Sequence, residues 1–374
     1  MEKLNILVTG GAGFIGSHLV DALIEKGHRV RILDSLVEQV HGPEPPAHLS
    51  KEAEFMRGDV CDAAAVAAAL DGIDVIYHQA AEVGVGQSMY EIVRYVKTND
   101  LGTAVLLEEM IKRPTQFKKL IVASSMSIYG EGAYRCGGCD MIVNPFLRSG
   151  EQLAAHDWEF KCETCGGQLE TIGTPEVKPL YPTSVYAVSK QDQEQYCLAV
   201  GRAYKIPTVA FRYFNVYGTR QALSNPYTGI CAIFSSRLMN DQAPTVFEDG
   251  EQTRDFVNVK DIVRANLLAL ETSGGDYNSF NIGTGRGTSV TQIAKLLAAG
   301  LGKNIEPVIV GKYREGDIRH CVADISKARK MLGYEPQITL EAGLTELLNW
   351  LADQEAEDKV ESATAELASR SLVK

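Results

Sequence analysis

The chain has 374 residues, 45% of them hydrophobic and 23% charged, which suits a soluble globular protein of about two domains at ~150 residues each. Its formal charge is −11, and this acidic balance argues against a nucleic-acid partner, because phosphate contacts need a basic surface. No apolar run reaches the ~20 residues that span a bilayer, and the first strand pattern begins at Leu4, without room for a signal peptide. We therefore expect a cytoplasmic protein with no membrane partner.

The first half of the chain alternates short apolar runs with segments of helical spacing. We predict helices at residues 16–26, 66–70 and 103–111, and strands near Phe55 and at residues 4–9, 30–33, 75–78 and 120–124. Strands and helices that alternate in this way are typical of a parallel sheet covered by helices on both faces. The expected fold class is α/β, with a doubly wound parallel sheet.

This alternation is interrupted between residues 132 and 180. The segment is rich in Gly and Pro, shows no sustained period and holds four clustered cysteines, so we interpret it as an insertion. The alternation then resumes with a predicted helix at residues 184–204 and a strand at residues 208–211.

The chain divides into two expected domains. The sheet and its insertion make up residues 1–217. Residues 218–352 are expected to form a smaller mixed α/β domain, partly interleaved with the first, with helices at residues 230–239 and 290–299. The polar residues 353–374 carry no clear turn signals, and we expect the end of a helix followed by a mobile tail.

A glycine-rich turn joins the first strand to the first helix. Gly10, Gly13 and Gly16 are spaced as GxxGxxG, and Phe14 and Ile15 lie between the last two. Glycine permits a tight turn and a close approach of the backbone to a pyrophosphate, and the helix N-terminus offers N–H groups to it. In this strand–turn–helix context the pattern predicts a dinucleotide site on a Rossmann fold.

Asp34 ends the second predicted strand. A carboxylate at this point accepts hydrogen bonds from the adenosine ribose and repels a 2′-phosphate. The next residues are Ser35 and Leu36 rather than an arginine, so the sequence favours NAD over NADP. The alternative is a solvated aspartate at a strand end.

Tyr186 and Lys190 form a YxxxK pair on a predicted helix. Residues four apart share one face of a helix, and an ammonium close to a phenol lowers the pKa of that phenol. Tyr186 would then serve as a general base near neutral pH. A surface pair is the alternative, but the glycine turn upstream and Ser124–Ser125 at a strand end favour a catalytic site.

Ordered motifs over residues 4–350 resemble the extended short-chain dehydrogenase/reductase family, specifically its nucleotide-sugar epimerases and dehydratases. In chain order they are TGGAGFIG (9–16), GDV (58–60), HQAA (78–81), Asn99, SSMSIYG (124–130), YAVSK (186–190), RYFNVYG (212–218), RDFVNVKD (254–261) and REGD (314–317). The resemblance implies a Rossmann domain, a substrate domain, bound NAD, a nucleotide-sugar substrate and a homodimer.

The resemblance also implies roles for individual residues. Ser125 would be the catalytic hydroxyl beside Tyr186. The cofactor contacts, besides the glycine turn and Asp34, would come from Asp59, Val60, Ala80, Ala81, Glu82, Asn99, Tyr186 and Lys190. The substrate contacts would come from Ser125, Ser127, Asn215, Arg220, Arg254 and Arg314, with the guanidinium groups on the phosphates.

The two positions after Ser125 bear on the reaction. The 4,6-dehydratases of the family carry an acidic pair there, whereas this chain has Met126 and Ser127. Neither side chain can perform the acid–base work of eliminating water, so the resemblance implies a 4-epimerase that works through a transient 4-keto sugar.

The sugar is less determined than the reaction. The stretch VGVGQSMYEI (83–92), the motif SSMSIYG and the cysteine insertion together look most like the bacterial dTDP-L-rhamnose 4-epimerases. UDP-glucuronate or another UDP-sugar 4-epimerase, a 4-ketosugar reductase and a decarboxylase are the alternatives within the family. A non-catalytic NAD-binding sensor is the alternative outside enzymes.

Four of the eight cysteines form two CxxC pairs inside the insertion, Cys136 with Cys139 and Cys162 with Cys165. Both sulfurs of a CxxC turn can reach one tetrahedral metal, and four thiolates leave no open position, so the spacing predicts a structural zinc. Two disulfides or a redox CxxC are the alternatives. We expect a small zinc-bound lobe near the mouth of the active site, and its few basic and aromatic residues argue against nucleic-acid binding.

Overall fold

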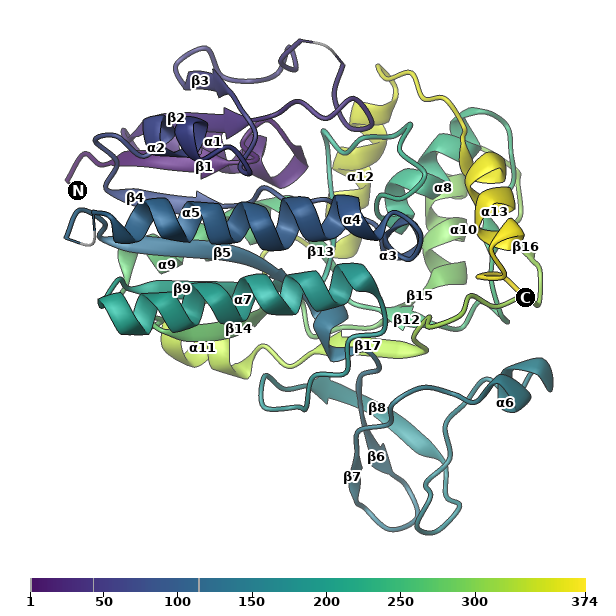
Figure 1. Ribbon diagram of the computed structural model, residues 1–374. Helices are drawn as coiled ribbons and strands as arrows, with labels where there is room; N and C mark the ends of the chain where they lie inside the picture. The colour runs from purple at the N-terminus through teal and green to yellow at the C-terminus, as the bar shows by residue number, and fades with distance from the viewer. Residues whose placement is uncertain (1, 43, 114) are drawn as a thin grey trace.

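The computed structural model describes residues 2–42, 44–113 and 115–374, and its centre is a seven-stranded parallel sheet (Figure 1). The strand order is β14-β9-β5-β4-β1-β2-β3. The strands are β1 (Asn5–Thr9), β2 (Arg29–Asp34), β3 (Glu54–Arg57), β4 (Val75–His78), β5 (Lys119–Ser125), β9 (Thr208–Tyr213) and β14 (Asn278–Ile282). The strands predicted in the first half of the sequence are confirmed, with bounds that shift by one or two residues.

Alternate side chains of the strands enter two separate cores, one on each face of the sheet. Ile6 and Val8 of β1 pack on one face with α1 (Phe14–Glu25), α9 (Val259–Glu271) and α11 (Ser326–Leu332). Leu7 packs on the other face with α2 (Ala63–Ala69), α5 (Gly102–Ile111) and α7 (Val185–Tyr204). Burial on both faces explains why these strands are continuous apolar runs, and it confirms the doubly wound α/β fold.

A third core belongs to the smaller unit. It lies between α8 (Ile230–Met239), α10 (Val290–Gly300) and α12 (Leu340–Leu351). The short strand pairs β10 (Asn215–Tyr217) with β13 (Phe256–Asn258), and β11 (Thr245–Val246) with β16 (Val308–Ile309), accompany these helices. The chain returns to the large sheet at β14, so the two units are interleaved in sequence.

The insertion extends a second sheet and projects from the body of the molecule (Figure 1). It contributes α6 (Gly150–Ala154) and the strands β6 (Ala133–Cys136), β7 (Ile142–Val143) and β8 (Leu169–Thr174). The six-stranded sheet has the order β15-β12-β17-β8-β6-β7, where β12 (Thr253–Arg254), β15 (Thr288–Ser289) and β17 (His320–Ala323) come from the smaller unit.

Buried ion pairs fasten this lobe to the smaller unit. Arg148 of the lobe donates two hydrogen bonds to Glu248, at 2.8 and 2.7 Å. Arg319, at the start of β17, contacts Glu248, Asp249 and the lobe residue Glu159. The side chains of Arg148 and Glu248 are only 2% and 1% exposed, so removal of one partner would leave a buried charge at a cost of about 3–5 kcal/mol.

The C-terminal segment differs from the expected mobile tail. Residues Val360–Ser369 form α13, and its Ala363 and Leu367 are buried. Short helical segments complete the fold: α3 (Val85–Ser88), α4 (Ile92–Tyr95), a π-helix at Val96–Leu101 and a 3-10 helix at Met126–Tyr129. Within the described residues, none of the helices combines the length and apolar character that a membrane crossing requires.

Candidate functional site

A cavity of about 680 Å³ opens at the carboxyl ends of the parallel strands. The chain leaves β1 toward β2 on one side and later adds β4 on the other, which makes this edge a topological switch point. Ligands of doubly wound sheets bind at such points. The cavity lies between the large sheet and the smaller unit, and both contribute lining residues.

The glycine turn brings three stretches of backbone into direct contact. A Cβ atom on Gly10, whose φ is +68°, would lie 2.7 Å from the backbone nitrogen of Ala80. One on Gly16 would lie 2.2 Å from the carbonyl oxygen of Gly10. Gly13 caps α1 without a side-chain hydrogen bond, so the first N–H groups of the helix face the cavity free for a diphosphate. The turn therefore fits a dinucleotide.

Asp34 lies where β2 ends and lines the same cavity. Its carboxylate accepts hydrogen bonds from the backbone N–H groups of Ala12, at 3.0 Å, and Leu36, at 2.9 Å. These two bonds hold the carboxylate at the rim of the glycine turn. Phe14, Ile15, Asp59, Val60 and the run Ala80–Glu82 also line the cavity.

The predicted catalytic residues converge from two elements. Ser125 is the last residue of β5, and Tyr186 lies in the first turn of α7. Burial raises the pKa of Tyr186, and a hydrogen bond with Ser125 opposes this effect. Burial also lowers the pKa of Lys190, one turn further along α7, to about 7. The pKa of Tyr186 is thus raised and not lowered as the sequence predicted, because burial outweighs the hydrogen bond with Ser125.

The hydroxyl of Ser125 has a fixed orientation. Ser127 donates to Ser125 Oγ from its backbone N–H, at 3.2 Å, and from its own hydroxyl, at 2.9 Å. Because Ser125 Oγ accepts these two bonds, its own proton is free to be donated toward Tyr186 or a bound oxygen. Met126 and Ser127 form the start of the 3-10 helix, where neither provides a carboxylate.

A buried polar chain that the sequence did not suggest continues behind Lys190. Lys190 Nζ donates to Gln193 Oε1 at 2.8 Å, and Gln193 Nε2 donates to Thr103 Oγ1 at 2.8 Å. Thr103 in turn contacts His78 at 3.0 Å, at the end of β4. The chain orients the ammonium of Lys190 below the cavity.

Asn215, Arg254 and Arg314 also line the cavity. Arg254 is held by Asp317 Oδ1 at 3.1 Å and by the carbonyl oxygen of Ile318 at 2.7 Å. The guanidinium of Arg314 lies 4.2 Å from the centre of the Phe247 ring, and burial lowers its pKa. Asn215 Oδ1 is buried without a hydrogen-bond partner. This concentration of donors and positive charge fits a diphosphate.

Two residues expected to touch ligands have other contacts. Asn99 is buried behind the cavity, where it accepts from the backbone N–H of Glu82 at 2.8 Å and donates to Ser189 Oγ at 2.9 Å. It positions Glu82 and α7 instead of lining the cavity. Arg220 donates to Asp21 at 2.7 Å and is not among the described cavity-lining residues.

The lining of the cavity differs from the expected one at two segments of the chain. Residues of α13, Ala363 and Leu367 among them, line it, although the sequence suggested a tail. Conversely, no described residue between 132 and 180 lines it. The lobe is therefore fastened to the smaller unit and does not form the mouth of the active site, contrary to expectation.

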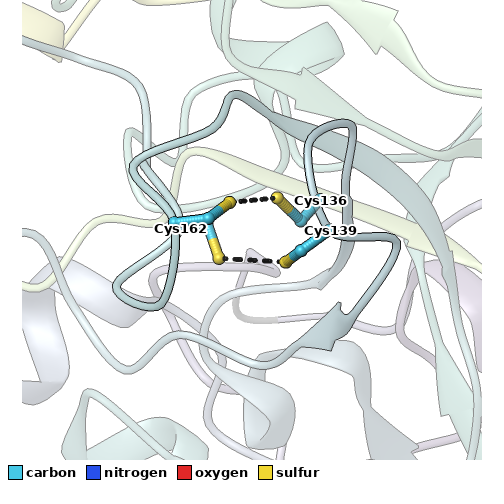
Figure 2. Close-up of side chains that lie close together, drawn as sticks. Cys136, Cys139 and Cys162 are labelled. Atoms are coloured by element: carbon cyan, nitrogen blue, oxygen red, sulfur yellow. Dashed lines mark hydrogen bonds between the residues drawn. The ribbon is translucent and has the colours of Figure 1, made fainter.

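The four cysteines of the lobe converge on one point (Figure 2). Their sulfur atoms all lie within 4.8 Å of one another, with Cys136 to Cys165 at 3.4 Å and Cys139 to Cys162 at 3.7 Å. Disulfide sulfurs are about 2.05 Å apart, whereas thiolates around a tetrahedral metal at ~2.3 Å are roughly 3.8 Å apart. The arrangement fits a four-coordinate metal and does not contain the predicted alternative of two disulfides.

Sequence and structure comparisons place these features among known proteins. Residues 6–147 match the family model "NAD dependent epimerase/dehydratase family", and residues 163–347 match that of GDP-mannose 4,6 dehydratase. A dTDP-L-rhamnose 4-epimerase of Burkholderia thailandensis is 37% identical over 95% of this chain and 96% of its own length.

Solved structures agree with the sequence relatives. The UDP-glucose 4-epimerase of Thermotoga maritima, with UDP-glucose, is 36% identical, with a TM-score of 0.76 over 93% of this chain and 99% of its own. The UDP-glucuronic acid 4-epimerase of Bacillus cereus, in complex with UDP-glucuronic acid and NAD, is 29% identical at a TM-score of 0.76, over 93% and 99% of the two chains. The chain belongs to the NAD-dependent epimerase/dehydratase family.

Proposed function

We propose that this protein inverts C4 of a nucleotide-activated hexose reversibly, with NAD held in the cavity, and that dTDP-L-rhamnose is its substrate. One observation carries the proposal. Ser125, Tyr186 and Lys190, from β5 and α7, line the same cavity as a second group formed by Asn215, Arg254 and Arg314. A nucleotide sugar bound by its diphosphate to the second group would present its hexose to the first.

Tyr186 removes the proton of the C4 hydroxyl, while Ser125 donates a hydrogen bond to the C4 oxygen. Lys190 stabilises the phenolate of Tyr186 through its positive charge. NAD held by the glycine turn and Asp34 would supply the hydride acceptor and donor for C4. After the 4-keto sugar turns its other face, Tyr186 gives the proton back. Met126 and Ser127 offer no acid or base for elimination of water, so return of the hydride completes the reaction.

The charges of the cavity favour a neutral sugar. Among the described lining residues, the lysines and arginines are Lys190, Arg254 and Arg314. Two of these suit the diphosphate and the third supports Tyr186. A hexuronate would bring a further carboxylate without a matching cation, which counts against UDP-glucuronate as substrate and against the decarboxylase alternative. The 37% identical dTDP-L-rhamnose 4-epimerase supports the same choice.

We also propose a homodimer and a structural zinc. Exposed apolar side chains lie on α4, on the π-helix that follows it and on α7: Ile92, Val93, Val96, Leu101 and Val188. A neighbouring copy would remove this surface from water. Cys136, Cys139, Cys162 and Cys165 would hold the zinc, whose role is to fix the lobe, because four thiolates leave no site for chemistry.

The role of the base is tested with Tyr186→Phe. The ring remains and only the hydroxyl is lost, so we expect kcat to fall by about 10²–10⁴-fold with the NAD content of the purified protein unchanged. Tyr204→Phe, at the exposed end of the same helix, is the matched control and should retain full turnover. Near-normal kcat for Tyr186→Phe would rule out the assignment.

The preference for NAD is tested with Asp34→Asn. The amide keeps one acceptor oxygen, enough for one of the two backbone N–H groups of Ala12 and Leu36, and lacks the charge that repels a 2′-phosphate. Calorimetric titration of cofactor-free protein should show NAD bound at least about tenfold more tightly than NADP before the change. The ratio should narrow afterwards, and equal affinities in the unchanged protein would contradict the proposed role of Asp34.

The reaction is tested with dTDP-L-rhamnose deuterated at C4. An epimerase returns the label to C4 of the product, because the same hydride leaves and comes back. Mass spectrometry and NMR of the product should find the deuterium retained, without net reduction of the cofactor. Accumulated NADH, released carbon dioxide or a stable 4-keto-6-deoxy sugar would each identify another reaction.

The metal is tested by native mass spectrometry. We expect one zinc per chain, lost when Cys136 and Cys139 are both changed to Ser, together with a lower melting temperature. Cys61→Ser, a half-buried cysteine outside the lobe, is the control and should keep the metal. A metal-free chain with two disulfides would refute the site.

A further inference from the structure

The C-terminal segment, residues 360–374, lies across the substrate side of the cavity. Leu367 of α13 packs against Gly86 of α3, where a Cβ atom on the glycine would lie 3.3 Å from Leu367 Cδ2. Arg370 stacks over the ring of Tyr90, with its guanidinium carbon 4.4 Å from the ring centre. The helix of the chain end thus contacts the NAD-binding half of the fold.

The last residues pair with the loop segment that carries Arg314, which forms an isolated antiparallel bridge with Val373. Glu315 donates its backbone N–H to the carbonyl oxygen of Leu372 at 3.0 Å. Tyr313 and Lys374 exchange two backbone hydrogen bonds, each 3.0 Å. Arg314, a proposed diphosphate contact, is therefore flanked on both sides by bonds to the chain end.

The linker before α13 is anchored to the smaller unit. Arg237 of α8 contacts Asp358 at 3.2 Å, and Ser224 Oγ accepts from the backbone N–H of Glu357 at 3.0 Å. Asn240 donates to the carbonyl oxygen of Ala356 at 2.8 Å. With contacts at both ends and along its linker, the segment is a built part of the site.

These contacts locate the segment relative to the sugar. Gly86 is two residues before Ser88, whose hydroxyl accepts a hydrogen bond from the backbone N–H of Tyr186 at 3.0 Å. The middle of the segment, at Leu367, therefore packs on the helix that contacts the proposed base, and its last residues adjoin Arg314. A hexose linked to a diphosphate must occupy the interval between these two groups, which the segment spans.

The face that the segment turns to the cavity is mainly apolar. Its lining residues are Val360, Ala363, Thr364, Leu367 and Leu372, and α3 adds Val85. We infer that residues 360–374 form a wall that selects the C5 substituent of the sugar, accepting a methyl group and disfavouring a hydroxymethyl or carboxylate group. The inference rests on the proposed function and names the substrate class as 6-deoxyhexoses.

The physical reason is the unequal treatment of methyl and hydroxyl groups. A methyl group gains from burial against Leu367 and Ala363, whereas a hydroxyl that loses water there finds few partners. An apolar pocket of this kind distinguishes groups that differ by one hydroxyl by about 10- to 100-fold.

The experiment compares dTDP-L-rhamnose with dTDP-L-mannose, which differ only in the C6 hydroxyl. Affinities are measured by calorimetry on the NAD-loaded protein. The value of kcat/KM is taken from the rate at which the C4-inverted product forms, and its retained deuterium identifies that product. The unchanged protein should prefer the 6-deoxy sugar by about 10- to 100-fold in both measurements. Leu367→Asn, which keeps the number and branching of the side-chain heavy atoms and adds polar groups, should reduce that preference about tenfold.

Ala368→Asn is the matched control, because it places the same side chain one residue along α13 on the exposed face. It should leave the preference unchanged, and both variants should keep the NAD content of the parent, although Leu367→Asn should lower the melting temperature because Leu367 is buried. Equal affinity for the two sugars, or an unchanged preference in Leu367→Asn, would contradict the inference that residues 360–374 select the C5 substituent. Binding that discriminates as expected without inversion at C4 would instead reject the epimerase and retain the wall.

Discussion

The site depends on the close backbone contact between the glycine turn and the segment after β4. Gly10, Gly16 and Ala80 approach so closely that a single Cβ atom at either glycine would collide with backbone. This contact sets α1 directly on the sheet and aims its N-terminus at the cavity. It also fixes the run Ala80–Glu82, which leads into the short helices beside Tyr186. The cofactor pocket and the proposed catalytic helix are thus registered against each other by one steric constraint.

Burial works against the charged forms of the two proposed catalytic side chains. It raises the pKa of Tyr186 and lowers that of Lys190 to about 7, so it disfavours both the phenolate of Tyr186 and the ammonium of Lys190. The hydrogen bond from Ser125 favours the phenolate, and the chain through Gln193 and Thr103 holds the ammonium in place. The hydrogen bond with Ser125 is thus the contact that favours the charged form of the proposed base.

Local patterns were enough to predict most of the large sheet, its helices and the residues of the cofactor turn. Period, glycine spacing and strand ends are properties of short stretches, and Ser125, Tyr186, Lys190 and the four cysteines all lie in such stretches. What escaped prediction depends on partners that are distant in sequence. The apolar side chain of Leu367 packs against Gly86, which lies far earlier in the sequence. Asn99 and Arg220 were assigned by motif position, but their actual partners are Glu82 and Asp21.

The cysteine lobe leaves and rejoins the fold at neighbouring points. Ala133 and Ile172 are paired across β6 and β8, and the hydroxyl of Thr174 accepts from the backbone N–H of Ala133 at 3.1 Å. The two chain segments that connect the lobe to the rest of the fold are therefore only about one strand spacing, ~4.8 Å, apart. A short turn could join these two segments, and a longer insertion could replace the lobe at the same place. Neither change would displace Ser125 upstream or Tyr186 downstream. An exchange of the lobe would therefore spare Ser125 and Tyr186, and its structural cost would fall on Glu248 of the smaller unit, which would lose its buried partner Arg148.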